Sequence, residues 1–147
     1  MTIDIKKASI KDSSFFFLLR NEKEALKNSF NSNSINLKNH NYWMKKQLKD
    51  KKNIFLIAKK NSEAFGVIRY NLNNMIAHIS INIAKKFRNL GYGSTALKYS
   101  EKFLKESLIV IAEVKKGNKG SLNFFKKNKY EIFIKKKYFI LIKIIKR

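Results

Sequence analysis

The sequence predicts an α/β fold in which a mixed, mostly antiparallel sheet of about seven strands is flanked by about four helices. β-branched and aromatic runs alternate with amphipathic segments along the chain. The 147 residues and 44% hydrophobic content are sufficient for one packed core. Because no repeat or Gly/Ser-rich linker interrupts the sequence, residues 1–147 are predicted to form a single domain.

The first third is predicted to contain one strand and two helices. Residues 3–9 read as the strand, and Asp12 is placed to cap a helix over residues 13–30. The polar segment 31–36 is typical of a loop. A second helix follows over residues 37–51 and brings three apolar side chains to one face: Trp43, Met44 and Leu48.

The remainder is predicted to complete the sheet. Three antiparallel strands joined by turn residues are expected at residues 53–60, 65–72 and 75–84. A helix over 92–106 follows, and the nearly continuous apolar run 107–114 is typical of a strand buried on both faces. A short helix over 121–128 and a strand pair over 130–145 end the chain.

Composition excludes several kinds of site. There is no cysteine, hence no disulfide or thiolate nucleophile. The chain has only two histidines, His40 and His78, which makes a histidine-based zinc site improbable. The amino-terminal residues lack the apolar core of a signal peptide, and no apolar run reaches the length of a membrane span. A cytoplasmic protein without membrane association is therefore expected.

The formal net charge of +23 has two interpretations. It favours anionic partners such as nucleic acid or phosphorylated ligands. Alternatively it reflects composition, because lysine, asparagine and isoleucine dominate every segment and proline is absent. The lysines are not gathered into one tail or stripe, so the charge alone identifies no specific partner.

The segment FRNLGYGSTAL (87–97) places two of the five glycines between a strand and a helix start. Such a turn exposes backbone N–H groups at the positive end of a helix dipole. Glycine lets an anion approach the backbone closely, and Arg88, Ser94 and Thr95 add charge and hydroxyl donors. A phosphate or pyrophosphate ligand is indicated, although a plain tight connection has the same spacing.

Two motifs resemble the GNAT N-acetyltransferases. Arg88-x-x-Gly91-x-Gly93 matches the Arg/Gln-x-x-Gly-x-Gly/Ala pattern of that family, between its fourth strand and the following helix. A later segment is similar to a second family motif, in which an asparagine precedes a small residue, an aromatic pair and a Gly-Phe pair. The corresponding residues here are Asn118, Ser121, Phe124-Phe125 and Lys129-Tyr130.

The resemblance implies the GNAT fold and acetyl-CoA as the acetyl donor, bound where the fourth and fifth strands splay apart. The pantetheine arm would pair with backbone groups around Ile81, Asn82 and Ile83. The pyrophosphate would lie on backbone amides of the turn, at Arg88, Asn89, Leu90, Gly91, Tyr92, Gly93 and Ser94. Asn118 and Phe125 would flank the cofactor near its thioester. No metal is expected, because the thioester is already activated.

Glu113 is the first candidate for the base that takes the proton from the amine. It interrupts the apolar run 107–114, and a carboxylate in a buried strand is costly unless it is paired, hydrated or used. Its position resembles that of a glutamate that acts as a base through water in the ribosomal-protein-acetylating branch. The alternative is an ion pair with a nearby lysine. His78 is the second candidate, or else a packed or surface group.

Two positions depart from the family pattern. Many relatives have a tyrosine at the position of Phe125, where it protonates the departing thiolate, and phenylalanine has no such proton. Tyr130 or another tyrosine then substitutes, or the thiolate leaves without help, or the chain is catalytically weak. Lys129 replaces the usual glycine and indicates an altered turn before Tyr130.

The acceptor side has a looser resemblance. An Arg-Asn pair (Arg20-Asn21) and a His-x-x-Trp pattern (His40 and Trp43) resemble acetyltransferases that modify nucleotide-linked amino sugars of the pseudaminic acid type. Arg20 would suit an acceptor diphosphate. In the alternative interpretation Trp43 belongs to the core, and Arg20 and His40 lie on the helix surface.

Three functions therefore stay open. The first is acetyl-CoA-dependent acetylation of a primary amine on a small-molecule acceptor, a nucleotide sugar, by a monomer or homodimer. The second is acetylation of a protein N-terminus or ribosomal protein. The third is a non-catalytic nucleic-acid-binding module, which the core-like placement of the aromatic residues disfavours.

Overall fold

The protein was analysed as a computed structural model that describes residues 2–31, 33–106 and 108–147. Ser32 of the predicted loop and Ser107, the predicted first residue of a strand, lie outside these ranges. The centre of the fold is a seven-stranded mixed sheet of order β1-β2-β3-β4-β5-β7-β6, in which only β4 and β5 are parallel neighbours. The predicted α/β class with a mostly antiparallel sheet is confirmed.

The elements follow in the predicted order. The strands are β1 (Ile3–Lys7), β2 (Asn53–Lys60), β3 (Glu63–Asn73), β4 (Ile76–Ile83), β5 (Leu108–Lys115), β6 (Glu131–Ile134) and β7 (Tyr138–Ile145). The α-helices are α1 (Ser13–Arg20), α2 (Lys23–Asn28), α3 (Leu37–Lys49), α4 (Tyr92–Ser100) and α5 (Lys119–Lys127). Short 3₁₀ turns precede α1, precede α4 and follow α4, at Ile10–Asp12, Lys85–Phe87 and Glu101–Phe103.

The predicted helix over residues 13–30 is two helices. The side chain of Asn21 donates to the Phe17 carbonyl at 3.1 Å and accepts from Ile35 N–H at 3.4 Å, which offers the backbone an alternative to the helix. Asp12 does not cap α1 as predicted. Its carboxylate accepts from the backbone N–H of Ser9 at 2.9 Å, within a capping box on the preceding 3₁₀ turn.

Two further predictions were wrong in detail. The helix expected over 92–106 ends at Ser100 and continues as a single 3₁₀ turn. Strand β5 is not buried on both faces: its burial alternates, and Glu113 lies on the more exposed face. The run of apolar residues hid this alternation, because Ile109 and Ile111 are apolar but only partly buried.

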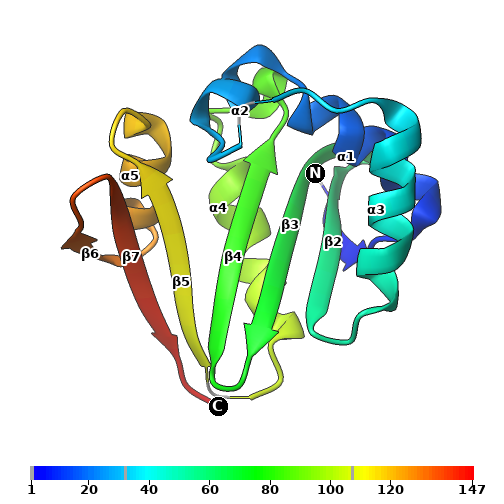
Figure 1. The fold of residues 1–147 in the computed structure, drawn as a ribbon. Helices are drawn as coiled ribbons and strands as arrows, with labels where there is room; N and C mark the ends of the chain where they lie inside the picture. Colours follow the sequence, from blue (N-terminus) through cyan, green and yellow to red (C-terminus); the bar gives the residue numbers. More distant parts are fainter. Residues whose placement is uncertain (1, 32, 107) are drawn as a thin grey trace.

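The two faces of the sheet carry different layers. On one, here called the α4 face, α4 and α5 cover a large apolar cluster that includes Ile79, Leu97 and Phe125. In Figure 1 α4 passes behind β3 and β4, and α3 stands alongside β2. On the other, the α3 face, α1 and α3 cover a smaller cluster formed by Phe16, Leu19, Met44, Phe55 and Val67, with Trp43 and Leu48 packed against it.

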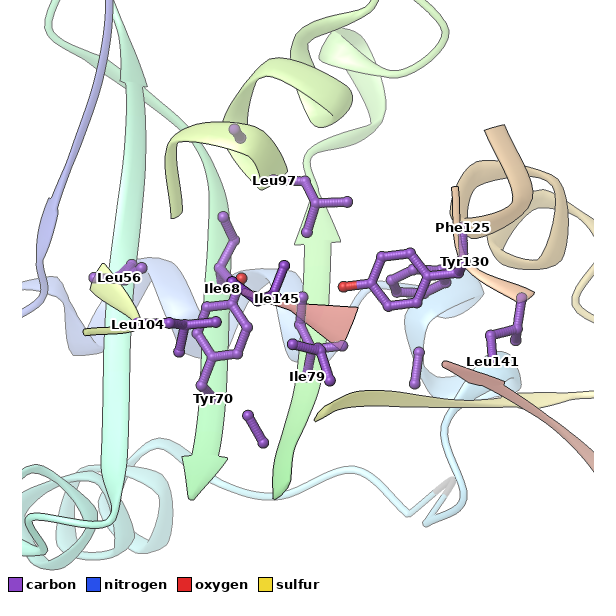
Figure 2. Close-up of a cluster of buried hydrophobic side chains, with 14 of the residues drawn as sticks. Leu56, Ile68, Tyr70, Ile79, Leu97, Leu104, Phe125, Tyr130, Leu141 and Ile145 are labelled. Carbon is purple, nitrogen blue, oxygen red and sulfur yellow. The ribbon is translucent and has the colours of Figure 1, made fainter. Parts of the chain in front are cut away.

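The core on the α4 face is formed by residues that are far apart in the sequence. Figure 2 shows Tyr70 and Leu104 on one side of this cluster and Phe125, Tyr130 and Leu141 on the other, with Ile79 of β4 between them. All of these side chains are at most 8% exposed. In the described ranges, no helix is long and apolar enough to cross a membrane.

Candidate functional site

The parallel strands β4 and β5 pair only at their amino-terminal ends. Their register covers three residue pairs, from Ile76 with Ile109 to His78 with Ile111. Beyond that point the two strands separate, and Figure 1 shows them meeting at the lower edge and diverging toward the top. The splay that the resemblance implied is therefore present in this chain.

The splay leaves backbone groups of β4 without a strand partner. Ala84 N–H donates to Phe65 O of β3 at 2.8 Å. Because hydrogen-bond direction alternates along an antiparallel strand, the backbone groups of Ile81 and Ile83 point to the opposite side, toward the diverging β5. Asn82 is different, since its backbone faces Val67 of β3 and its side-chain amide donates to Leu19 O of α1 at 3.1 Å. Of the three predicted pantetheine residues, Ile81 thus directs both backbone groups toward the opening, whereas Ile83 directs only its N–H there, because its carbonyl accepts from Arg88 Nε at 2.8 Å.

The glycine turn lies at the end of β4 and begins α4. Gly91 is the residue before the helix, with a left-handed φ of 86°, and Asn89 is also left-handed at 61°. A Cβ built on Gly91 would meet nothing within 4 Å. The backbone is therefore open in front of the helix N-terminus, where unpaired N–H groups attract an anion. These features fit a pyrophosphate group.

Most side chains of the turn are used elsewhere. The guanidinium of Arg88 donates from Nε to Ile83 O at 2.8 Å and pairs with Glu22 and Glu24 near α2. Tyr92 packs between Phe65 and Phe87. Leu90 is 61% exposed. The charge of Arg88 thus serves to hold α2 against β4, and ligand binding at this turn would depend on its backbone.

Helix α5 closes the other side of the splay. Asn118 caps it by accepting from Ser121 N–H at 3.1 Å. A Cβ on Gly93 would lie 3.1 Å from the ring of Phe124, and Asn128 donates to Ser94 Oγ at 3.1 Å. Phe125 is buried beside Tyr130, with ring centroids 5.0 Å apart. Of the two residues predicted to flank the cofactor, Asn118 thus caps α5, and Phe125 is a core residue of the α4 face.

Lys129 occupies the position at which the resembled motif has a glycine, and its backbone conformation is one that favours glycine. It adopts a φ of 71°, a left-handed conformation that costs a residue with a side chain roughly 1–2 kcal/mol. The turn geometry is thus kept although the glycine is replaced. The next residue, Tyr130, is 4% exposed and its hydroxyl has no hydrogen-bond partner among the described residues. Burial raises the pKa of Tyr130, which makes the hydroxyl a poor proton donor.

The two candidate bases lie next to each other. His78 Nδ1 is 4.0 Å from Glu113 Oε1, across the point where β4 and β5 begin to separate. Their side chains are 47% and 40% exposed, so Glu113 is not the buried carboxylate that the apolar run indicated. Both face the α3 side of the sheet, opposite the apolar cluster. Sequence reasoning proposed each residue separately and had no means of placing them together.

Two of the four predicted acceptor residues are in contact on the α3 face. His40 is buried at 1% exposure and its ring lies 5.6 Å from that of Trp43, so the surface interpretation of His40 is wrong. Neither ring nitrogen makes a hydrogen bond of good geometry with a residue that the structure describes. Burial is the main cause that lowers its pKa, the neighbouring Ser13 backbone opposes the fall, and the charges of Arg20 and Arg69 add to it. Asn21 has a structural role in the break between α1 and α2.

One residue at this place was missed. Arg69 of β3 lies with its Cζ 5.3 Å from the Trp43 ring centroid and 5.6 Å from that of Phe55. It borders a cavity of about 190 Å³ that His78 and Ser80 also line. The signal was available, because Arg69 interrupts the apolar strand FGVIRYNL as Glu113 interrupts its own strand.

Comparison with known families decides the identity of the fold. The model of the acetyltransferase (GNAT) family matches residues 16–130. The chain belongs to the GNAT family. It is thus an N-acetyltransferase whose acetyl donor is acetyl-CoA. Among curated proteins, none matches the sequence significantly.

Solved structures share the fold at low identity. A ribosomal-protein-alanine N-acetyltransferase from Brucella melitensis is 19% identical, with 97% of this chain and 99% of that chain covered and a TM-score of 0.76. A spermidine N-acetyltransferase from Vibrio cholerae, in complex with CoA and spermine, is 16% identical over 97% and 94% of the two chains, with a TM-score of 0.80. A putative acetyltransferase from Salmonella typhimurium, with acetyl-CoA, is 11% identical over 99% and 94%, with a TM-score of 0.74.

Proposed function

We propose that this GNAT enzyme acetylates the amino group of a nucleotide-linked amino sugar. The observation that carries the proposal is the composition of the α3 face beside the two candidate bases. Arg69 borders the same cavity as His78 and stacks on Trp43, and Trp43 contacts His40. These contacts, from His40 through Trp43 and Arg69 to the cavity at His78, support an acceptor site beside the candidate bases.

The residues divide between donor and acceptor. Acetyl-CoA supplies an activated acetyl group, and backbone groups of Ile81, Ile83 and the turn 88–94 are placed to hold it. Glu113 takes the proton of the attacking amine, through water, because its exposed carboxylate lies at the root of the splay. His78 Nδ1, at 4.0 Å from that carboxylate, is placed to orient it. Holding the amine close to the thioester carbonyl supplies most of the remaining rate enhancement.

A second candidate acceptor is the amino group of a protein, such as a ribosomal protein. The position of Glu113 favours it, because it resembles the glutamate of the ribosomal-protein-acetylating branch. Membership of an acetyltransferase family favours either acceptor over the non-catalytic nucleic-acid-binding alternative. The formal net charge of +23 suits either acceptor, a nucleotide sugar or an acidic protein segment.

Thermal unfolding with saturating acetyl-CoA tests the donor site. A ligand at about 100 times its dissociation constant stabilises the folded state by about 2.7 kcal/mol, which raises the melting temperature of a chain of this size by roughly 5–10 °C. ATP is the control, since it carries phosphates without the pantetheine arm. A shift with ATP alone, or none at all, would contradict the donor site.

Thiol release in the presence of an acceptor panel then tests the acceptor. The panel contains a UDP-linked amino sugar, an acidic peptide with an unblocked N-terminus, and spermidine. We expect the nucleotide sugar to give the highest kcat/KM. A preference for the peptide would replace the first acceptor by the second while leaving the enzyme class intact.

A further inference from the structure

Two of the chain's four arginines, Arg20 and Arg69, lie on the α3 face and have no carboxylate partner among the described residues. Arg88, by contrast, pairs with both Glu22 and Glu24. Within the described residues, neither Arg20 nor Arg69 makes a hydrogen bond or ion pair with an acidic side chain. The Nε of Arg20 is buried and has no hydrogen-bond partner in the part of the chain that the structure describes.

Both arginines are costly in the structure as it stands. Arg69 is partly buried, and burial, followed by the charge of Arg20, lowers the pKa of Arg69. Guanidinium groups nevertheless stay charged, so Arg69 keeps a positive charge in a region of reduced solvation. The buried Nε of Arg20, which has no partner among the described residues, adds to the cost. An oxyanion in contact with Arg69 would offset the cost of its burial.

The geometry of Arg69 is fixed before any ligand arrives. Its guanidinium lies over the rings of Trp43 and Phe55, and the strand pairings place Phe55 and Ser80 directly beside it in the sheet. Such stacking leaves the edge of the guanidinium available for a bidentate contact. The adjoining cavity leads from Arg69 to Ser80 and His78, and His78 is next to Glu113.

We propose that Arg69 forms an acceptor-side subsite for a phosphate or diphosphate group. This deepens the proposed function and rests on it only for the location of the amine. An acceptor held at this subsite reaches along the cavity toward His78 and Glu113. A polyamine such as spermine would bring positive charge to the guanidinium of Arg69 and is excluded by the same arrangement.

The fluorescence of Trp43 tests the subsite without any acetyl transfer. Trp43 is the only tryptophan in the chain, and Arg69 lies against its ring. The probe is pyrophosphate, titrated in the presence of saturating CoA so that the glycine turn does not compete. We expect a saturable change in the emission of Trp43, and no change with spermine.

Arg69→Gln and Lys136→Gln are the matched pair of variants. Each removes one positive charge, and Lys136 is an exposed residue of the β6–β7 turn. Loss of a bidentate charged contact should raise the pyrophosphate midpoint at least roughly tenfold in Arg69→Gln. Lys136→Gln should leave the midpoint within about twofold. Equal effects in the two variants would overturn the subsite, because the anion would then respond only to net charge.

Kinetics provide a second readout. In Arg69→Gln, KM for a phosphate-bearing amino sugar should rise at least roughly tenfold, while KM for the same sugar without phosphate stays unchanged. A Trp43 response to an acidic peptide but not to pyrophosphate would overturn the proposal in favour of carboxylate recognition. The acetyl-CoA thermal shift is independent of all these measurements, so a failure of the donor site and a failure of the subsite are distinguishable.

Discussion

The two faces of the sheet at β4 and β5 are built from alternate residues of the same two strands, yet they differ in burial and in polarity. On the α4 face, Ala77, Ile79, Ala112 and Val114 are buried in the large apolar cluster. On the α3 face, His78, Ser80 and Glu113 are exposed.

The difference separates stability from chemistry. Side chains of the α4 face contribute to the free energy of folding through burial, and changes there should leave the reacting groups untouched. The side chains of β4 and β5 that lie on the α3 face make few stabilising contacts, and changes there should alter rates or binding while the fold persists. Each of the following variants tests one side of this division.

The largest effect is expected at Glu113. Glu113→Gln removes the base while its exposed position leaves the fold intact, so kcat should fall roughly 100-fold or more. The affinity for acetyl-CoA, measured by calorimetry, should stay within about twofold. Glu131→Gln, another exposed acid on a strand, is the control and should retain full turnover. An unchanged kcat in Glu113→Gln would remove Glu113 as the base and leave His78 to be tested.

The second-largest effect is expected at the glycine turn. In Gly91→Glu a carboxylate occupies the place of the pyrophosphate, and a repulsion of a few kcal/mol corresponds to roughly 100-fold weaker CoA binding. Gly91→Ala is the matched control, because both variants force a side chain into a φ of 86° and should lose about 1 kcal/mol of stability. Equal loss of affinity in both would mean that backbone strain, and not charge, weakens binding.

Two buried tyrosines test the α4 face. The hydroxyl of Tyr70 is hydrogen-bonded to Ser100 Oγ at 2.7 Å. That of Tyr130 has no partner among residues 2–31, 33–106 and 108–147 and projects into the cluster (Figure 2). Tyr130→Phe should therefore stabilise the protein by about 1–2 kcal/mol, and Tyr70→Phe should destabilise it by about 1 kcal/mol. Urea unfolding measures both changes. Turnover should be unchanged in Tyr130→Phe, and a large fall would instead identify Tyr130 as the proton donor that Phe125 lacks.

Local pattern predicted the order of elements, because each strand and helix has its own apolar period. It also located the glycine turn, since the sequence around Gly91 carries both the conformational requirement and the helix start. It failed where a side chain competes with the backbone, as Asn21 does at the break between α1 and α2. It also failed to predict which residues meet across strands.

Contacts within the candidate site were likewise not predictable from the sequence. The 4.0 Å approach of His78 to Glu113 depends on the register of two strands about 30 residues apart in the sequence, which no local pattern contains. Arg69 was missed for a related reason. Its significance lies in the absence of a nearby carboxylate within the described residues, and this is a property of the folded arrangement.

The smallest effect concerns His40, the buried histidine of the helical layer on the α3 face. Its pKa is lowered from 6.5 by burial, so below pH 6.5 the unfolded chain binds a proton that the folded chain does not. Stability should therefore fall as the pH drops from 6.5 toward the folded-state value, by at most about 1.4 kcal/mol per pH unit, and level off below it. Ser13, Arg20 and Arg69 are the neighbours that set this value.

Urea midpoints between pH 7.5 and about 5, above the range where most carboxylates titrate, measure this dependence. They should fall in the parent protein and be flatter in His40→Gln, which has no imidazole to bind a proton. Asn39→Gln, a neutral substitution at an exposed position of the same helix, is the control and should fall as the parent does. A fall of equal size in His40→Gln would mean that the pH dependence does not originate at His40, and the assignment of titration to the helical layer would be wrong.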